Sequence, residues 1–434
     1  MLKKNYKYGL FFFFFLIILI IFGNNGNDTI WNYGMAHAIR IGEIPYKDFN
    51  IISTPLYAFI MSLGLFIKDT YFVYILEQAL LCTIFIFLVE KLIDKNYLLV
   101  LISFCFPIFN LLFPSYNFFV LLLLVVLLYL EKNKKPNYLI GIVLGLLILS
   151  KHTIGGFVLF FSMISTLNFK RGFKRLLYAL IPISIFGLYL IITDSLYSFI
   201  DLSILGMFDF GKNNSSIFIF SIIVSLLVFI YTIYSIYKDK TNIYNYYLLG
   251  SMIFVIPICD LFHIFYLICF FLIVFLLNHK IVLTKKRLYF TSAIFVSLII
   301  GLNIVCNYSF LSNIGNNNLT AFKGKLLDTK RIVYVNNILR KYKSYDNRYM
   351  ISMASMFFDI ESNNKITYFD IPLHGNFGYN GIEKMKKKID KCHNSYFFLS
   401  DSTNIQFSIE FNDYIRKKYD YVDRVEDYTI YYIK

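Results

Sequence analysis

Residues 217–236 read IFIFSIIVSLLVFIYTIYSI, an apolar run without a charged residue. A transmembrane α-helix needs about 20 consecutive, predominantly apolar residues to cross the hydrocarbon core of a bilayer. A charged side chain at the centre of a membrane costs at least about 2.5 kcal/mol, which explains why such a run carries none. The run therefore predicts a transmembrane helix.

Apolar stretches recur through most of the chain. The sequence is 58% hydrophobic and 16% charged, with a mean hydropathy of +0.60, whereas a soluble domain carries about 25% charged residues. We therefore expect a polytopic α-helical membrane protein with about 11 transmembrane helices. Pro55–Ile67 is a further apolar stretch, better suited to an interfacial helix than to a span. The other expected spans are Gly9–Phe22, Tyr71–Val89, Tyr97–Phe113, Phe118–Leu130, Leu139–Leu149, Ile154–Leu167, Leu176–Ile192, Tyr244–Ile258, Phe262–Leu277 and Leu288–Val305.

The basic residues predict the orientation of the chain, because Lys and Arg accumulate in cytoplasmic loops. If the N-terminus is cytoplasmic, the clusters Lys132–Lys135, Lys170–Arg175 and Lys285–Arg287 all fall in cytoplasmic loops. We expect a multi-pass protein of the plasma (inner) membrane, and an odd number of spans places Asn307–Lys434 outside the cytoplasm. The clusters lie beside apolar stretches, so topology explains the net charge of +15 without a nucleic-acid partner.

The C-terminal part of the chain has the character of a small soluble domain. Gly381–Cys392 has the pattern of a basic amphipathic helix, and residues 332–340 fit either a strand or a short helix. Strands are expected at Tyr349–Met353, Lys365–Phe369, Tyr396–Ser400 and Tyr428–Ile433. The sequence thus predicts a transmembrane domain over residues 1–306, with a first external loop at 24–70, and an extracytoplasmic α/β domain over 307–434.

The first external loop is expected to begin with a helix from Thr29 to Ile41. Asp28 is suited to be its N-cap and Gly42 its C-cap. Trp31, the single Trp of the chain, lies where an interfacial Trp is favoured. A largely apolar stripe would let the helix lie in the membrane interface. The stripe consists of Ile30, Tyr33, His37 and Ile41.

The same loop resembles the first external loop of membrane glycosyltransferases of the GT-C fold, such as the protein O-mannosyltransferases and the lipid A aminoarabinose transferases. The matching residues are Asp28, Tyr33, Gly42, Pro45, Tyr46, Asp48, Phe49, Pro55 and Leu56. The resemblance implies transfer of a sugar from a polyprenyl-phosphate donor to an acceptor at the extracytoplasmic face, with the first-loop carboxylate acting near the acceptor. Many members have an Asp-Glu pair, and this chain has Thr29 at the second position.

Sugar transfer from a lipid phosphate requires a carboxylate that takes the acceptor's proton and cations that hold the phosphate leaving group. We expect Asp28 to be the catalytic carboxylate, with Asp48 as the second candidate. Asp48 has an alternative role, in which it orders the loop by accepting backbone hydrogen bonds.

The expected substrate-binding residues lie in the same loop and in two later turns on the outer side. Lys151 runs against the charge bias of that side, so it needs a partner such as phosphate or must extend to the lipid headgroups. Two further ionisable residues, Asp260 and His263, would share a helix face, and their mutual hydrogen bond would order the turn. The full expected set is Tyr33, Arg40, Lys151, His152, Asp260 and His263.

Other functions fit parts of the pattern. A transporter or lipid flippase would show internal repeats and mid-span charges, and a non-catalytic cell-envelope protein would depend on its exported domain. A divalent metal ion is possible, although neither the six cysteines nor other residues show a ligand spacing. The Gly/Asn-rich segment His374–Gly381 does not match phosphate-binding glycine patterns, and an ordinary turn is expected there. The leading hypothesis requires Asp28, Lys151 and His263 to converge at the outer membrane surface.

Overall fold

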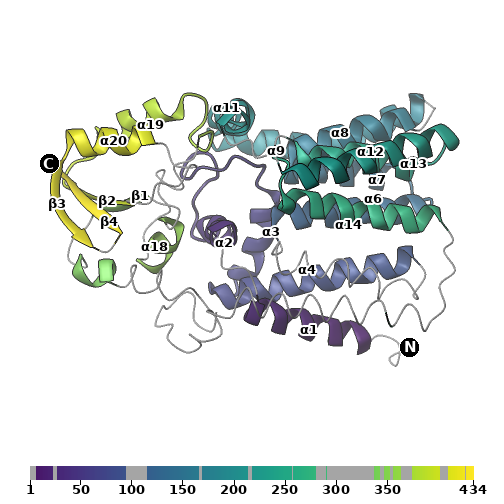
Figure 1. The fold of residues 1–434 in the computed structure, drawn as a ribbon, viewed down its shortest axis with the longest axis horizontal. Helices are drawn as coiled ribbons and strands as arrows, with labels where there is room; N and C mark the ends of the chain where they lie inside the picture. Colours follow the sequence, from purple (N-terminus) through teal and green to yellow (C-terminus); the bar gives the residue numbers. More distant parts are fainter. Residues whose placement is uncertain are drawn as a thin grey trace. The chain divides into compact units, whose positions relative to one another are not determined.

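The computed structural model describes residues 6–22, 27–93, 115–165, 169–213, 218–256, 258–279, 290, 337–342, 347–351, 355–362, 374–400, 409–425 and 427–434. The chain divides into two compact units, each described here by itself (Figure 1). The helical unit comprises Met1–Asn24, Ile75–Leu188 and Ser216–Ser309. The mixed unit comprises Asn25–Tyr74, Tyr189–Ser215 and Phe310–Lys434.

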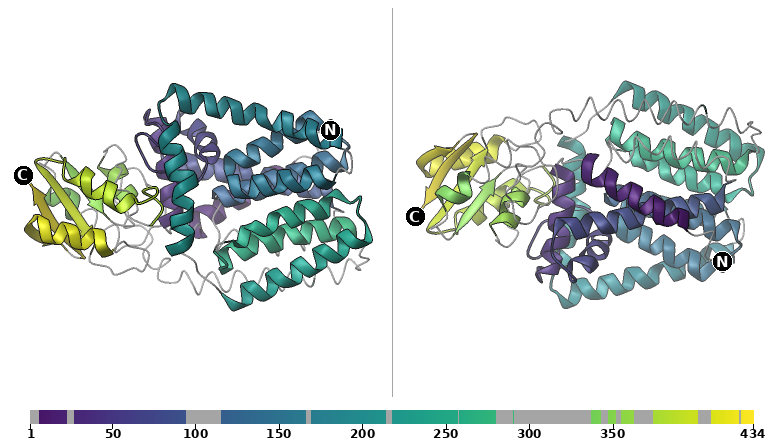
Figure 2. Two further views of the ribbon diagram at one scale, coloured as in Figure 1. Left: turned by 90° about the horizontal axis from the view of Figure 1, so that it is seen from above. Right: turned by 90° about the horizontal axis from the view of Figure 1, so that it is seen from below.

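The helical unit is built from long apolar helices that run side by side (Figure 2). It includes most of α4 and α9, which also contribute residues to the mixed unit. Its elements are α1 (Tyr6–Phe22), α4 (Tyr71–Leu92), α6 (Tyr116–Lys132), α7 (Asn137–Ser150), α8 (His152–Ser165), α9 (Phe169–Ile192), α12 (Ile219–Lys238), α13 (Ile243–Ser251), the 3₁₀ turn η3 (Met252–Val255) and α14 (Leu261–Asn278).

Each predicted span that falls on described residues is helical over most of its length. The stretch 97–113 lies outside the described residues, and so does 288–305 except for Phe290. Within 244–258 the α-helix ends at Ser251, a 3₁₀ turn follows, and Ile256 is extended with φ −125° and ψ 129°. Pro257 comes next in the sequence, and the residue before a proline is disfavoured in helical backbone.

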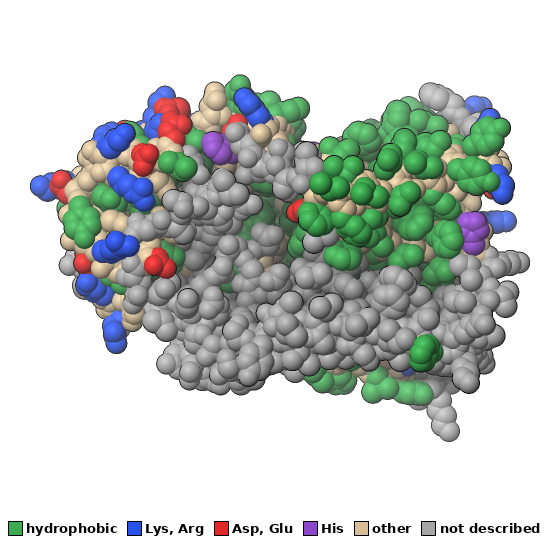
Figure 3. All heavy atoms as spheres, in the orientation of Figure 1, with side chains coloured by type: hydrophobic (Ala, Val, Ile, Leu, Met, Phe, Trp, Pro, Cys, Tyr) green, Lys and Arg blue, Asp and Glu red, His purple; other side chains and the backbone are tan. Residues whose placement is uncertain are grey.

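Among the described residues, three helices are long and apolar enough to cross a membrane, namely Tyr71–Leu92, Lys170–Ile192 and Ile219–Lys238. In α12, Ile219 is 74% exposed and Leu227 is 61% exposed. Hydrophobic side chains also dominate the bundle surface at the upper right of Figure 3. Exposed apolar surface of this extent is suited to contact with lipid. The exact number of spans stays a prediction.

Small residues let α7 and α9 pack closely. A Cβ atom on Gly145 would lie 2.4 Å from the carbonyl oxygen of Ala179, and one on Gly141 would lie 2.6 Å from that of Arg175. Two small residues four positions apart are a common contact surface between membrane helices, because they let the backbones approach. These glycines therefore fix the spacing of the two helices.

The mixed unit combines short helices with one small sheet. Its helices are α2 (Asn27–Arg40), α3 (Leu56–Leu65), α10 (Leu196–Phe199), the π-helix η2 (Ile200–Leu205), α11 (Gly206–Asn213), α18 (Ser355–Glu361), α19 (Gly381–Ile389) and α20 (Ile409–Lys418). Its strands are β1 (Arg348–Ile351), β2 (Ser395–Ser400), β3 (Asp420–Val425) and β4 (Tyr428–Ile433).

The strands form one sheet in the order β1-β2-β4-β3, in which β1 is parallel to β2 and the other two pairs are antiparallel. The central strand β2 is covered on both faces. Phe397 belongs to a core that includes Met385 of α19 and Phe411 of α20. The neighbouring Phe398 meets Phe358 of α18, with 5.5 Å between ring centroids. The C-terminal part of the chain is therefore an α/β arrangement.

The strands predicted at 349–353, 396–400 and 428–433 and the helix predicted at 381–392 are confirmed as β1, β2, β4 and α19. The strand predicted at 365–369 lies outside the described residues. Strand β3 was not predicted, because it is a largely exposed edge strand that carries Asp420, Asp423 and Arg424. A polar edge strand lacks the alternation of a half-buried strand.

The helix predicted at Thr29–Ile41 is α2, and Gly42 follows it with φ +92°, as expected of a C-terminal glycine. Two expectations are wrong. The helix begins at Asn27, so Asp28 lies in its first turn and is not the N-cap. Residues 29–38 are all buried, Trp31 included, so α2 is not an interfacial surface helix. It packs against α3 and α18, and α18 comes from a distant part of the chain.

Candidate functional site

Lys151 lies in the extended turn between α7 and α8 of the helical unit. Its ammonium group donates a hydrogen bond of 2.9 Å to Oδ1 of Asn117. It also lies over two aromatic rings, 5.5 Å from the centroid of Tyr116 and 6.0 Å from that of Phe254. Aromatic faces stabilise a cation through their negative quadrupole. Among the residues that the structure describes, no carboxylate forms an ion pair with Lys151.

The amide of Asn117 is held in place by the start of α6. Ser115 is the N-cap of this helix, and its hydroxyl accepts a hydrogen bond of 3.2 Å from the backbone N–H of Asn117. The same hydroxyl lies 3.4 Å from the Tyr266 hydroxyl of α14. Asn117 is 1% exposed. Asn117, which accepts the hydrogen bond of the Lys151 ammonium group, is therefore buried and held by the hydrogen-bonded start of α6.

Asp260 and His263 form the third part of this site, at the start of α14. Asp260 is the N-cap, and its Oδ1 accepts hydrogen bonds of 2.8 Å from the backbone N–H of His263 and from its ring Nδ1. The two side chains therefore share a helix face, as predicted, and their hydrogen bonds order the turn. We call the group of Tyr116, Asn117, Lys151, Phe254, Asp260 and His263 the Lys151 cluster.

The electrostatics of the cluster follow from burial. Burial lowers the pKa of Lys151 to about 8, and the negative charge of Asp260 opposes this shift. Burial also raises the pKa of Asp260, but the hydrogen bonds from His263 outweigh it and hold that pKa below its usual value. The next residue, His152, is the first of α8, and its buried Nδ1 has no hydrogen-bond partner among the described residues. Next to the Lys151 cluster, Nδ1 of His152 is therefore a buried hydrogen-bonding atom without a partner among the described residues.

The first-loop candidates lie in the mixed unit. The Asp48 carboxylate accepts a hydrogen bond of 2.7 Å from the Ile44 backbone N–H, so it orders the turn that it belongs to. Arg40 donates from Nε to the carbonyl oxygen of Leu65 and lies over the ring of Phe66. The backbone of Asp28 is in α2, and its side chain lies outside the described part of the structure.

A hydrogen-bonded pair that the sequence did not reveal connects α2 with the end of the loop. Nδ1 of His37 lies 2.9 Å from a carboxylate oxygen of Asp69. Tyr33 also hydrogen-bonds to Asp69, and burial raises its pKa above the usual range. Its ring is fully buried, with its centroid 4.9 Å from that of Tyr71. Tyr33, predicted to bind substrate, therefore lies in the interior of the mixed unit.

The structure brings Lys151, His152, Asp260 and His263 to one end of the helical unit, where α6, α8 and α14 begin and α7 ends. The other four predicted residues, Asp28, Tyr33, Arg40 and Asp48, lie in the mixed unit. The expected convergence of Asp28 with Lys151 and His263 stays a prediction. Within the described residues, no group of three His, Cys, Asp or Glu side chains is placed to hold a metal ion.

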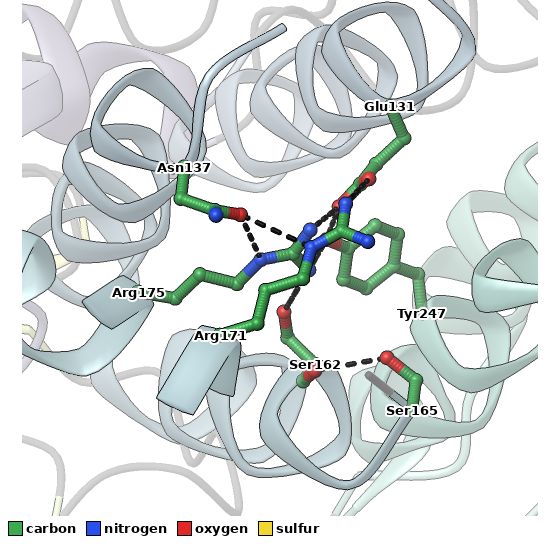
Figure 4. Close-up of polar contacts among 7 residues, drawn as sticks. All are labelled: Glu131, Asn137, Ser162, Ser165, Arg171, Arg175 and Tyr247. Carbon is green, nitrogen blue, oxygen red and sulfur yellow. Dashed lines mark hydrogen bonds and ion pairs between the residues drawn. The ribbon is translucent and has the colours of Figure 1, made fainter. Parts of the chain in front are cut away.

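A second polar cluster lies at the opposite ends of α6, α7 and α8 and joins these helices to α9 and α13 (Figure 4). Fully buried Arg175 has Nη2 2.7 Å from Oε1 of Glu131, and its Nη1 donates to the Ser162 hydroxyl at 2.9 Å. The Tyr247 hydroxyl donates to Glu131 at 2.7 Å, and Asn137 accepts from Nε of Arg175 at 3.2 Å. The charges of Glu131 and Arg175 neutralise one another. We therefore assign this second cluster a structural role, which the sequence did not reveal.

No protein-family model matches the chain, and no curated protein does. Its structure is similar to the crystal structure of ArnT from Cupriavidus metallidurans bound to undecaprenyl phosphate, with a TM-score of 0.60 and 10% sequence identity. The alignment covers 99% of this chain and 98% of that chain. ArnT is an aminoarabinose transferase of the GT-C fold. This similarity confirms the expected GT-C-like fold.

Loss of one member of the Glu131 cluster should strongly destabilise the helical unit. Glu131→Leu leaves the Arg175 guanidinium buried without its carboxylate, and breaking a buried ion pair in this way costs about 3–5 kcal/mol. The double variant Glu131→Leu/Arg175→Met removes both charges and should recover much of the loss. The measurement is the thermal unfolding midpoint in detergent. Exposed Lys174, in the same helix as Arg175, supplies the control Lys174→Gln. Equal midpoints for Glu131→Leu and the wild type would contradict the assignment.

Proposed function

We propose that this protein transfers a sugar from a polyprenyl-phosphate donor to an acceptor at the extracytoplasmic face of the membrane. The fold supports the proposal, because a protein of the same fold has been solved with undecaprenyl phosphate bound. The observation that carries it is the cation of Lys151, held against Asn117 without a carboxylate partner among the described residues. The acceptor, whether a glycan, a lipid or a protein, is not specified by the proposal.

The Lys151 cluster is suited to hold the phosphate of the donor. An ammonium group has three N–H donors, and Asn117 accepts one of them. Two donors are then available for phosphate oxygens. Lys binds phosphate as a point charge, and a cation next to the leaving phosphate stabilises the charge that develops as the glycosidic bond breaks. His152 and His263 would supply further hydrogen bonds at this end of the helices.

In the proposed mechanism, Asp28 takes the proton of the acceptor as it attacks the anomeric carbon. The carboxylate of Asp48 already accepts a backbone hydrogen bond, so its contribution would be to order the loop. The proposed contribution of Arg40 is similar, because it holds the end of α3 through Leu65. Tyr33 would contribute by packing. This division leaves Asp28 as the proposed base.

The proposal includes a multi-pass topology in the plasma (inner) membrane, with a cytoplasmic N-terminus, an extracytoplasmic C-terminus and membrane lipids as neighbours. The expected location of the C-terminus is open to a direct test. The test uses cells whose outer envelope layers have been removed while the plasma membrane stays closed. Protease added to these cells should cleave a tag placed after Lys434. A tag that is cleaved only after the membrane is opened would overturn this topology.

The variant Asp28→Asn tests the proposed base. It removes the proton acceptor and keeps the size of the side chain, so transfer should fall by about 10²–10⁴-fold, as expected for loss of a general base. The assay incubates purified protein with a panel of undecaprenyl-phosphate sugars and a cell-envelope fraction, and measures release of undecaprenyl phosphate. Binding of undecaprenyl phosphate should be unchanged in the same variant. Transfer at the wild-type rate would remove Asp28 from the mechanism.

The pKa of Lys151 predicts how binding depends on pH. Because this pKa is about 8 in the free protein, the side chain is charged below pH 8 and loses its charge above it. The affinity for undecaprenyl phosphate should therefore fall by up to about tenfold per pH unit above pH 8. Lys151→Arg keeps its charge at all these pH values and should abolish the decline.

The companion variant Lys151→Gln should bind about 10–100-fold more weakly at pH 7, because it loses a charge-assisted hydrogen bond. Isothermal titration in nanodiscs between pH 7 and 9.5 measures all three proteins. Affinity that is independent of pH in the wild type and unchanged by Lys151→Gln would show that the phosphate binds elsewhere.

A further inference from the structure

The π-helix η2 lies in the middle of the segment Tyr189–Ser215, within the mixed unit. π-helical turns are rare and occur often at functional sites. Two other parts of the same unit contact η2 and its neighbours. One is the Gly/Asn-rich segment before α19 together with the first turn of α19, and the other is the turn Ile44–Ser53 of the first loop.

Asp201 of η2 contacts the Gly/Asn-rich segment directly. Its Oδ1 accepts a hydrogen bond of 3.3 Å from the backbone N–H of Tyr379, and its Oδ2 pairs with the ammonium group of Lys384. Gly378 has φ +81°, and a Cβ atom there would lie 2.3 Å from Asp201 Oδ2. Because any side chain at Gly378 would displace the carboxylate, this glycine is needed for the contact.

A second contact joins two backbones. A Cβ atom on Gly206, the first residue of α11, would lie 2.6 Å from the carbonyl oxygen of Gly375. A Cβ atom on Gly375, whose φ is +87°, would lie 2.5 Å from the carbonyl oxygen of Gly206. Backbone atoms cannot move aside as a flexible side chain can. The glycines that the sequence placed in an ordinary turn are therefore required by close packing.

The other side of this segment contacts the first-loop turn. The buried Ser203 hydroxyl of η2 donates to the carbonyl oxygen of Ile51 at 3.3 Å. The ring centroid of Phe199 lies 5.2 Å from that of Tyr46. Tyr46 has φ +70°, and its hydroxyl donates to the carbonyl oxygen of Ser53 at 2.9 Å. The turn thus has an unusual backbone, which is held by a hydrogen bond of its own and is contacted by Phe199 and Ser203.

We propose that η2 is a positioning element that couples the Gly375–Lys384 segment of the C-terminal part to the turn Ile44–Ser53, with Asp201 as the positioning residue. The soluble part then acts on the first loop by fixing its backbone. The coupling itself is independent of the activity, and only its consequence for transfer rests on the proposed function.

Hydrogen exchange of the full-length protein in detergent, read by mass spectrometry, tests the coupling. Asp201→Asn and Gly206→Ala should each speed exchange by about tenfold in 374–384 and also in 44–53, as expected for the loss of one or two hydrogen bonds. In the turn, the reporters are the amides of Ile44, Tyr46 and Asp48. Faster exchange confined to 374–384 would overturn the proposal, and so would no change in either segment.

Matched variants separate the coupling from general loosening. Gly156→Ala is the control for Gly206→Ala, because a Cβ atom on this helical glycine meets nothing within 4 Å. Lys384→Arg should keep wild-type exchange, whereas Lys384→Gln should resemble Asp201→Asn. Exposed Lys387 in the same helix supplies the control Lys387→Gln. If Lys384→Arg loosened 44–53 as much as Lys384→Gln, charge pairing with Asp201 would not be the cause.

The consequence for transfer is measured separately. Asp201→Asn should raise the KM for the acceptor several-fold while binding of undecaprenyl phosphate stays unchanged. If the wild-type protein transferred no sugar, the proposed function would fail, and the exchange experiment would still decide whether the coupling exists. If the exchange result were as expected and the KM unchanged, the coupling would stand without a role in acceptor binding.

Discussion

The interaction on which the functional account depends is the hydrogen bond between the Lys151 ammonium and the Asn117 amide oxygen. An amide oxygen and two aromatic faces orient this cation without neutralising its charge. Burial makes the charge costly, as the lowered pKa shows. Lys151 is a partly buried, oriented cation without an ion-pair partner among the described residues. Such a cation suits a binding site for an anion, because the ligand's charge offsets a cost already present.

The two ends of the helical unit differ in how their charged side chains are paired. At one end, Glu131, Arg175 and Tyr247 neutralise and hydrogen-bond one another, and the cluster holds the helices together. At the other end, Lys151 has an amide as its partner, and Asp260 is engaged with His263. The charges of Glu131 and Arg175 are thus paired within the protein, whereas the Lys151 ammonium group has an uncharged hydrogen-bond partner. A phosphate group bound at the Lys151 cluster would supply a negative charge to this ammonium group.

Much of the helical unit could be predicted, because a long apolar run has few alternatives to a buried or membrane-spanning helix. Lys151 could also be singled out, since a lysine between two such runs is unusual. Asn117 as its partner, the pair of Glu131 and Arg175, and the covering of α2 by α18 could not be predicted. Each depends on segments that are distant in sequence, and contacts of this kind leave no local pattern. The placement of Asp28 near the Lys151 cluster stays a prediction.

The central claim is that the Lys151 cluster binds the phosphate of a polyprenyl-phosphate lipid. The most direct measurement is an experimental structure of the full-length protein in nanodiscs with undecaprenyl phosphate added. We expect the phosphate within hydrogen-bond distance of Lys151 Nζ, which keeps its contact with Asn117. A phosphate bound elsewhere, with Lys151 unchanged and the end of the bundle empty, would contradict the account.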